Sequence, residues 1–547
     1  MNWFSRVLAN VAPAFALKRE IALRRMSRLE TMRPQRSIDA IGNGRMYFDI
    51  TAPKKSPDSA IYTSLEGTRN HVRQLEYNNG FISGPIRRIV NNTVGTGFRY
   101  QSRVTADTRN IEFPKINERM AEDYNTQKER AYRKWQKQAD MRLRLSFNRI
   151  CRVLMAATIR DGEVLAIGRE SNRRGRVIPY CLELLEADRL QTPAKEISNP
   201  RIQQGIEYDD EGVPVRYFVL KVHPGDCLTW NRKLDDFEEI DAFYPNGNRK
   251  VLHLYDPMRP EQSRGLTEFA SALANFQNLD RYQEAEIMAA LEDACMSGVV
   301  TTESPADFQA NYTVGDLTGT GEGGDEVTKS RVHEFAPLKW HYMNPGEKVD
   351  IHSPKRPNDK FGEMINQLLR GPSNSLDIPP EVLSQNWQGM NYSNARTVLL
   401  QFYLSCWVRE STFQETFLDP VHENISDWFA IKGLTPSIGY DRRREDYLNH
   451  SWIAQTGREW VDPQSESKGK ANDCDNGFDT HYSVAGLRGY DAEELLEDEA
   501  RYLRKKKAIE IRDGIEFPKA KTEQAKPKPQ EEDKGDGEDK KSLRIMK

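Results

Sequence analysis

The feature that most constrains the fold is a long stretch almost free of helix-breaking residues. Between Arg264 and Ser297 the chain has no proline and one glycine, Gly265, near the start. Apolar residues recur there at a broken helical spacing; they are Leu266, Phe269, Ala270, Leu273, Phe276, Ile287, Leu291, Ala294 and Cys295. A continuous helix over this stretch would be roughly 50 Å long and would need an equally long surface to pack against. We therefore expect a rod-shaped element.

A second long helix is predicted from about Asn394, with Ser393 as its N-cap. Pro420 must kink or restart it, with Asp419 placed to cap the new segment, and the helix should end near Gly433. Other helical patterns are found at residues 61–95 with an interruption near Gly80–Pro85, at 117–160, at 357–371 with an end at Gly371-Pro372, and from Asp491 onward.

Short strands are expected between these helices, because β-branched and aromatic residues stand there between turn signals. The predicted strands are Glu163–Glu170, Val177–Leu185, Gly205–Tyr208, Val215–Val222 and Val251–Tyr255. The turn Asp209–Gly212 should join two of them as a hairpin. The predicted fold class is α+β, mainly helical, with small β-rich parts.

Charge is balanced overall but uneven along the chain. The 79 basic and 82 acidic residues give a net charge of −3, which argues against tight DNA binding by the whole chain. Residues 1–36 carry eight basic and two acidic residues, a net charge of +6. This basic arm, represented by Lys18, Arg19, Arg24, Arg25 and Arg28, is either a solvated segment or a contact for nucleic acid or an acidic partner.

A glycine-rich segment at residues 299–331 has the opposite charge. It carries six acidic and two basic residues, a net charge of −4, and the acids include Asp316, Glu322, Asp325 and Glu326. The simplest interpretation is that these acids keep an exposed loop soluble. The alternative is a functional acidic surface.

Motifs for catalysis and cofactor binding are missing or out of context. The sequence has no GxxxxGK[ST], HExxH or GxSxG pattern, and its nine histidines do not cluster. The GxGxxG match at 319–324 follows no apolar strand and opens no helix. The six cysteines are widely spaced without a CxxC pair, which favours reduced thiols. We expect no catalytic residues, no metal and no cofactor. The early apolar run Val7–Leu17 is too short to span a membrane.

Seven ordered segments resemble the lambda-type portal protein family of tailed bacteriophages. They are Asn92–Phe98, Leu184–Leu190, Gly205–Asp209, Arg259–Gly265, Asn391–Arg396, Gly457–Pro463 and Gly486–Glu494. The resemblance runs from about residue 62 to 505. The segment Gln385–Gly389 and the acidic glycine-rich segment depart from the family pattern.

The resemblance implies a ring, typically of twelve subunits, built from wing, stem, clip and crown regions. It implies a DNA channel at one capsid vertex that serves genome packaging, retention and ejection. Implied partners are double-stranded DNA passing without sequence specificity, the terminase large subunit, the major capsid protein and scaffold, and head-completion or tail adaptor proteins. The expected location is the virion, and the host cytoplasm during assembly, with no membrane partner and no enzymatic activity.

The resemblance, together with the composition of the two ends, divides the chain into regions. They are an arm and linker at 1–60, a wing at 61–255, a stem helix at 256–297, a clip at 298–350, a second stem helix and turn at 351–383, a tunnel loop at 384–393, a kinked wing helix and following segment at 394–479, a crown at 480–517, and a disordered tail at 518–547. The acidic segment would then lie in the clip, near the terminase motor.

The tunnel loop is expected to face DNA. Its residues are Gln385, Asn386, Trp387, Gln388, Gly389, Met390, Asn391, Tyr392 and Ser393. Uncharged amides can touch phosphates without the salt-dependent affinity that a fixed positive charge adds. The alternative is a capped turn that packs on the following helix.

Two competing functions remain at this point. A nucleic-acid-binding enzyme or regulator could use the basic arm as its anchor, but it should also carry a catalytic or metal motif. Another ring or adaptor component of a virion is the second alternative, and the length of 547 residues argues against it.

Overall fold

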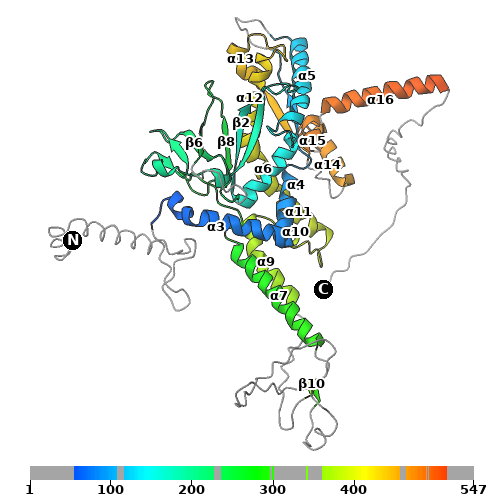
Figure 1. The fold of residues 1–547 in the computed structure, drawn as a ribbon. Coiled ribbons are helices and arrows are strands. Elements are labelled where there is room, and N and C mark those ends of the chain that lie inside the picture. Colours follow the sequence, from blue (N-terminus) through cyan, green and yellow to red (C-terminus); the bar gives the residue numbers. More distant parts are fainter. Residues whose placement is uncertain are drawn as a thin grey trace, which may run out of the picture.

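The computed structural model describes residues 54–106, 116–226, 236–295, 299–300, 341–342, 360–455, 463–487, 490 and 492–513. The basic arm, nearly all of the clip and the predicted tail lie outside these residues. The described part has a mixed helical and sheet body from which the helices α7 and α9 project together and α16 extends separately (Figure 1). The predicted mainly helical α+β class is confirmed.

Four helices and a strand open the described chain. They are α3 (Pro57–Asn78), α4 (Gly80–Thr93), β1 (Phe98–Ser102), α5 (Glu118–Trp135) and α6 (Phe147–Asp161). The interruption expected near Gly80–Pro85 lies at Asn79 instead, where the backbone is extended and the side chain accepts a hydrogen bond from the Phe81 N–H. Pro85 is buried inside α4.

Two antiparallel sheets form the β-rich part of the body. The first has the order β3 (Tyr180–Glu186), β2 (Glu163–Glu170), β8 (Val251–Tyr255). The second has the order β4 (Ile202–Gln203), β5 (Ile206–Tyr208), β6 (Pro214–Leu220), β7 (Phe237–Asp241). The predicted Asp209–Gly212 turn does join β5 to β6.

A third sheet pairs segments that are far apart in the sequence. Strand β1 runs antiparallel to β11 (His450–Ala454), with Tyr100 opposite Trp452. Local patterns did not predict either strand, because each is stabilised by a partner about 350 positions away. The short strands β9 (Val299–Val300) and β10 (His341–Tyr342) form a parallel pair.

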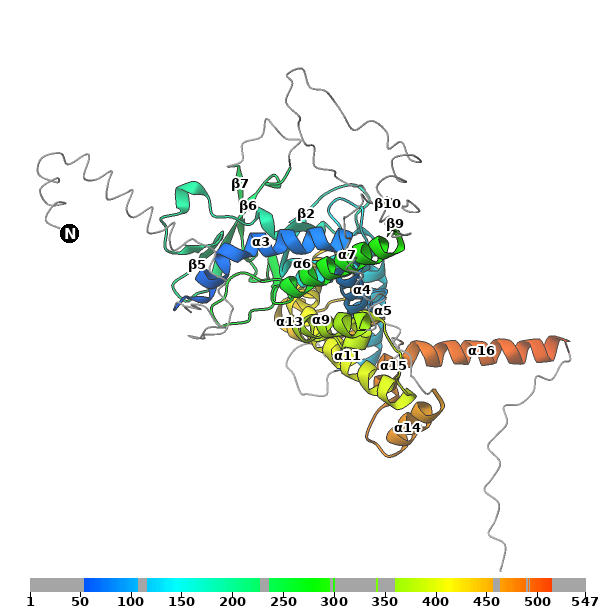
Figure 2. The ribbon, with the colours of Figure 1, turned by 90° about the horizontal axis from the view of Figure 1, so that it is seen from below.

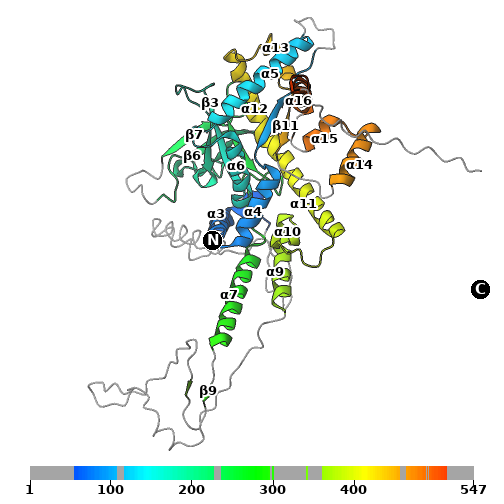
Figure 3. The ribbon, with the colours of Figure 1, turned by 90° about the vertical axis from the view of Figure 1, so that its right-hand side faces the viewer.

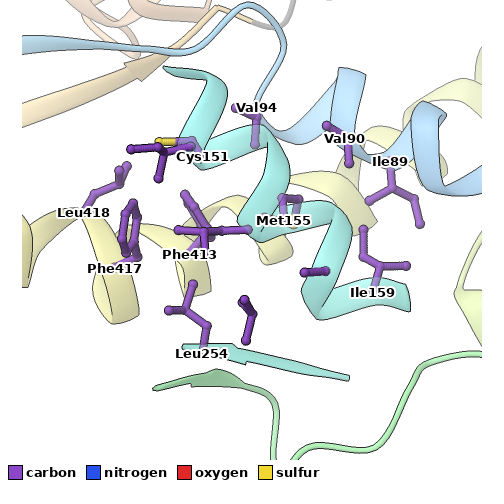
Figure 4. Packing of buried hydrophobic residues seen from close by; sticks show 14 of the residues in the cluster. Ile89, Val90, Val94, Cys151, Met155, Ile159, Leu254, Phe413, Phe417 and Leu418 are labelled. Carbon is purple, nitrogen blue, oxygen red and sulfur yellow. The ribbon is translucent and has the colours of Figure 1, made fainter. Parts of the chain in front are cut away.

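Figure 4 shows how α6 packs at the centre of the main core. Its residues Cys151, Met155 and Ile159 lie among side chains from α4, from β8 and from the segment 413–418. Burying each large apolar side chain contributes about 1.5–3 kcal/mol relative to exposure. The described cysteines Cys151, Cys181, Cys406 and Cys474 are free thiols, as expected.

The first long helix is shorter than predicted. Helix α7 (Leu273–Cys295) has 23 residues, about 35 Å, and the residues from Arg264 to Ala272 form turns in the body. The reason is tertiary: Leu266 and Phe269 are buried in the body, and Arg264 is bonded there.

The second stem helix, α9 (Phe361–Leu376), ends five residues after the predicted end at Gly371, because it continues through Pro372. Leu369, Pro372 and Leu376 are all buried, which offsets the one hydrogen bond that a proline removes. The short helix α10 (Pro380–Ser384) follows.

The second long helix is built from three pieces. Helix α11 (Tyr392–Phe413) leads into a π-helical turn, η4 (Gln414–Leu418), and then into α12 (Asp419–Ile431). The break expected at Pro420 is therefore this π turn, a common irregularity inside helices.

Both predicted caps of this helix are wrong. Asn391 caps α11 by accepting from the Asn394 N–H at 2.9 Å, so Ser393 lies within the helix. Asp419 has helical backbone angles, and its carboxylate accepts from Trp452 Nε1 at 3.0 Å instead of capping. The structure continues with α13 (Tyr440–Tyr447), α14 (Pro463–Asp475), α15 (His481–Leu487) and α16 (Ala492–Asp513). None of the described helices is both long and apolar enough to cross a bilayer.

Candidate DNA-channel elements and their buried anchor

The projecting helices α7 and α9 lie side by side (Figures 1 and 3). The rings of Tyr282 and Phe361 stack between them at a centroid distance of 5.7 Å. At the base, α9 approaches so closely that a Cβ on Gly371 would lie 2.2 Å from Asn275 Nδ2. Glycine thus permits the tight contact, and the two helices form one hairpin, which we call the stem hairpin.

Apolar side chains of the stem hairpin face solvent. The exposed ones are Ile287, Met288 and Leu291 of α7 and Met364 of α9, which are 44–63% accessible. Isolated exposed apolar residues are ordinary, but several on one projecting helix indicate a surface that another molecule covers.

The root of the stem hairpin touches the body backbone to backbone. A Cβ on Gly265 would lie 2.1 Å from the carbonyl oxygen of Gly162, and a Cβ on Gly162 would lie 2.3 Å from the Leu266 carbonyl carbon. Gly162 also has φ +85°, a conformation that side chains disfavour. Both positions therefore require glycine, and the segment before α7 is fixed against the turn between α6 and β2.

A buried carboxylate anchors the same segment. Glu163, the first residue of β2, has no exposed side-chain surface. Arg264 lies against it, with Nε 2.9 Å from both carboxylate oxygens and Nη2 2.6 Å from Oε1. Arg69 of α3 donates from Nη2 at 2.7 Å, and the Gly265 N–H donates at 3.1 Å. His253 of β8 completes the group, with Nε2 2.9 Å from Oε2. We call these five residues the Glu163 anchor.

The remaining donors of Arg264 are satisfied by backbone carbonyls. Its Nη1 donates to Leu190 and Gln204, at 3.1 and 3.0 Å, and its Nη2 donates to Ala187 at 3.0 Å. One guanidinium thus binds the carboxylate of β2 and three loop carbonyls. Because a buried charge is costly when unpaired, this geometry fixes the position of Arg264 strongly.

The anchor sets the protonation of its members. Burial alone would raise the pKa of the Glu163 carboxyl, but Arg264 and the hydrogen bond with His253 outweigh burial, so this pKa lies well below its ordinary value. Burial, together with the nearby charges of Arg264 and Arg69, lowers the pKa of His253 despite its hydrogen bond with Glu163. The Glu163 carboxylate is therefore charged and held by two arginines, and the neutral imidazole of His253 donates to it from Nε2.

A second ion-pair group lies beside the anchor. Arg73 of α3 donates to Asp161 at 2.8 Å and to Asp188 at 2.7 Å, and it approaches Glu186 at 3.7 Å. His223 Nε2 lies 3.0 Å from Glu186. The acids Glu186 and Asp188 with His223 are close enough to share a cation, but Arg73 already supplies positive charge there. We interpret this group as ion pairing that ties α3 to the sheet.

The predicted tunnel loop is an exposed connection between α10 and α11. Gln385 and Gly389 have left-handed backbones, with φ +57° and +76°. Asn386 accepts from the Gln388 N–H at 3.2 Å, which fixes the turn locally. The loop ends at Asn391, so Tyr392 and Ser393 belong to the first turn of α11, contrary to the predicted boundary. All nine positions except Met390 are exposed.

Helix α11 is apolar on two opposite faces. Phe402, Cys406 and Phe413 are buried against the body. The other face exposes a stripe of Leu400, Leu404, Trp407 and Val408, each 54–60% accessible. A contiguous apolar stripe that stays exposed on a helix already packed by its other face marks a surface that another molecule covers. We call these four residues the α11 stripe and infer that assembly covers them.

Neither the Glu163 anchor nor the α11 stripe was predicted from the sequence. The anchor could have been suspected from Glu163, a glutamate at the start of a mostly apolar predicted strand. The stripe could have been suspected from Leu400 and Leu404, which lie off the buried face of the predicted helix. The arm residues Lys18, Arg19, Arg24, Arg25 and Arg28 and the clip acids Asp316, Glu322, Asp325 and Glu326 lie outside the described residues, so their roles stay predictions.

Comparison with known proteins settles the class. The family model described as phage portal protein, lambda family, matches residues 43–409. The chain therefore belongs to the lambda family of phage portal proteins. It is 24% identical over 482 residues to the "Probable portal protein" of Halomonas phage phiHAP-1, which covers 86% of this chain and 85% of the relative. It is 20% identical over 494 residues to "Portal protein B" of Escherichia phage lambda, at 86% and 90% coverage.

Solved structures give a weaker likeness. A chain from the "Virion of native gene transfer agent (GTA) particle" is 11% identical, with a TM-score of 0.38, over 78% of this chain and 94% of that chain. A chain from the "Neck of native GTA particle computed with C12 symmetry" has the same TM-score over 77% and 94%.

Family membership confirms the resemblance and the general function. The chain is a portal protein of the capsid vertex, a structural channel protein, and it is not an enzyme. The alternative of a nucleic-acid-binding enzyme or regulator is thereby wrong.

Proposed function

We propose that copies of this chain close into a ring of about twelve, with the stem hairpins standing side by side around a DNA channel. The observation that carries this proposal is the pair of exposed apolar surfaces, on α7 and on α11, that one chain leaves uncovered. A ring uses two different surfaces of each copy, which meet head to tail and close by rotation.

Within this ring, the stem hairpin lines the channel and the loop at 385–391 projects toward the DNA. Its amides offer hydrogen bonds without fixed positive charge, so contact with the duplex stays weak and independent of sequence. A channel that passes DNA during both packaging and ejection needs such weak contact. The Glu163 anchor holds the root of each stem hairpin at a fixed angle to its wing.

The other partners follow from the family resemblance. The clip would meet the terminase large subunit, with its acids at Asp316, Glu322, Asp325 and Glu326. The wing and the basic arm would face the major capsid protein and scaffold, and head-completion or tail adaptor proteins would bind after packaging. Assembly would take place in the host cytoplasm.

Charged substitutions in the α11 stripe test whether this surface is needed for ring formation. The variants Leu404→Glu and Trp407→Glu should fold as the unaltered chain does but sediment as monomers, because a charge would be buried at each contact between copies. Ile197→Glu, at a residue 72% exposed on a separate loop, is the matched control and should still form rings. Rings of normal size from the stripe variants would contradict the proposal.

Deletion of residues 385–390 tests the channel loop. We expect intact rings with impaired packaging or poor retention of DNA, because the deletion removes the loop and leaves the Asn391 cap of α11 in place. Replacement of Ser198 and Asn199, in a loop of the β-rich part, by alanine serves as the control. Normal phage yield from the deletion would count against a channel role.

A further inference from the structure

A groove of about 1130 Å³ opens between the start of α3, the four-stranded sheet and the end of β8. Figure 2 shows the first turn of α3 beside β5, where the groove lies. His253 of the Glu163 anchor lines this groove, whereas the stem hairpin and the loop at 385–391 do not. Four tyrosines line its walls, Tyr62, Tyr208, Tyr217 and Tyr255.

The rim of this groove is acidic. Its carboxylates are Asp58, Asp209, Asp210, Glu211 and Glu261, and its lining contains one arginine, Arg201. Three of the acids are engaged: Asp210 with Arg201 at 2.6 Å, Asp58 with the Ser263 hydroxyl, and Asp209 with the N–H groups of its own turn.

Two acids of the rim carry uncompensated charge. In the part of the chain that the structure describes, no basic side chain pairs with Glu211 or Glu261. Aromatic rings attract arginine and lysine side chains through their faces, and unpaired carboxylates attract them through charge. An acidic groove with tyrosine walls therefore suits a basic peptide.

This chain has such a peptide, and the segment that connects it to the body ends next to the groove. Ser56 and Pro57 line the groove, and residues 37–55 connect them to the basic arm. Residues 1–36 have a net charge of +6, and the seventeen residues 37–53 can reach up to about 55–60 Å. The short tether gives the arm an effective concentration in the millimolar range at this groove.

We propose that the basic arm of each chain, residues 18–36, docks in the tyrosine-walled acidic groove of the same chain. The arm is then held against the wing until a polyanion, such as DNA, binds the arm and draws it out of the groove. The docked state depends on charge, so salt weakens it. This docking is independent of ring formation.

Cleavage of the full-length chain by an arginine-specific protease tests the proposal. At low salt, cleavage within residues 1–36 should be about tenfold faster in the double variant Asp210→Lys/Glu211→Lys than in the unaltered chain, since this variant replaces rim acids by cations. The new lysines create no site for this protease. One molar salt should remove the protection from the unaltered chain.

The control variant is Glu122→Lys/Asp123→Lys, which changes two neighbouring exposed acids on α5. It should protect the arm as the unaltered chain does. Equal acceleration in both variants, or no protection in the unaltered chain, would overturn the docking site.

A zero-length crosslinker decides which copy supplies the arm. Lys18 is the single lysine before Lys54, so its links to groove carboxylates report the arm alone. In a mixture of isotope-labelled and unlabelled protein, we expect links from Lys18 to Asp210, Glu211 or Glu261 within one chain. Links between chains, or links spread over the surface, would contradict docking of the chain's own arm.

Discussion

The root of the stem hairpin and the hairpin itself use charged and apolar residues in opposite ways. At the root, a fully buried carboxylate is surrounded by two arginines, a histidine and a backbone N–H. Along the hairpin, Ile287, Met288 and Leu291 are exposed. The buried charges of the root are all paired within one chain, whereas the hairpin exposes apolar side chains that neighbouring copies can cover. In such a subunit, contacts within the chain fix the direction of the stem hairpin, and contacts between chains cover its exposed apolar surface.

The largest expected effect comes from removing the carboxylate at the root. Glu163→Ala leaves the buried Arg264 without its counter-charge and leaves Arg69 paired with Asp188 alone, so the free energy of unfolding should fall by about 3–5 kcal/mol. Urea unfolding measures this change. Asp210→Ala, which removes an exposed ion pair with Arg201, should cost about 0–1 kcal/mol. Equal losses of unfolding free energy in the two variants would show that Glu163 contributes no more than an exposed ion pair does.

A smaller effect is expected from crowding the backbone contact. Gly265→Ala places a methyl group against the Gly162 carbonyl and should destabilise the chain by about 1–3 kcal/mol. Gly362→Ala on α9 meets no atom within 4 Å and should be neutral or stabilise by up to about 1 kcal/mol. Thermal unfolding compares the two, and a neutral Gly265→Ala would mean that the root can shift.

The pH dependence of the root should follow the depressed pKa of Glu163. A carboxyl with a lower pKa in the folded chain than in the unfolded chain stabilises the fold above its ordinary value of 4.5. That contribution is lost as the pH falls below 4.5 toward the folded pKa. The difference in unfolding free energy between the unaltered chain and Glu163→Gln should therefore be constant from pH 6 to 8 and shrink below pH 4.5. A difference that grows in acid would refute this assignment.

The smallest effect on stability is expected on the stem hairpin. Leu291→Asp changes an exposed residue, so the unfolding free energy of the monomer should stay within about 0.5 kcal/mol. Ring formation should nevertheless fail, because the aspartate would be buried between neighbouring hairpins. Sedimentation measures assembly, and Tyr77→Asp, at a residue 88% exposed on α3, is the control. A destabilised monomer would place Leu291 in the core instead.

Local sequence patterns predicted elements whose structure is decided locally. The strands at 163–170 and 251–255 have the predicted bounds, and the hairpin turn at 209–212 was correct. The start of α7 was wrong because Arg264 is held by a carboxylate 101 positions away. The pairing of β1 with β11 was missed for the same reason, since its stabilising partner is remote.

The candidate site was only partly accessible from the sequence. Polar composition located the exposed loop at 385–391, although not the Asn391 cap that ends it. Sequence spacing does not show which charges are buried together, so Glu163, Arg69 and Arg264 could not be grouped. The resemblance marked Arg259–Gly265 as a segment before the stem, and the structure shows Arg264 and Gly265 at its root.

Electron microscopy of the purified full-length chain shows whether its copies close into a ring. We predict closed rings of about twelve copies with a central hole that admits a DNA duplex, and with stem hairpins projecting from one side. Particles that remain single chains at high concentration, or that join into open chains without a hole, would contradict it.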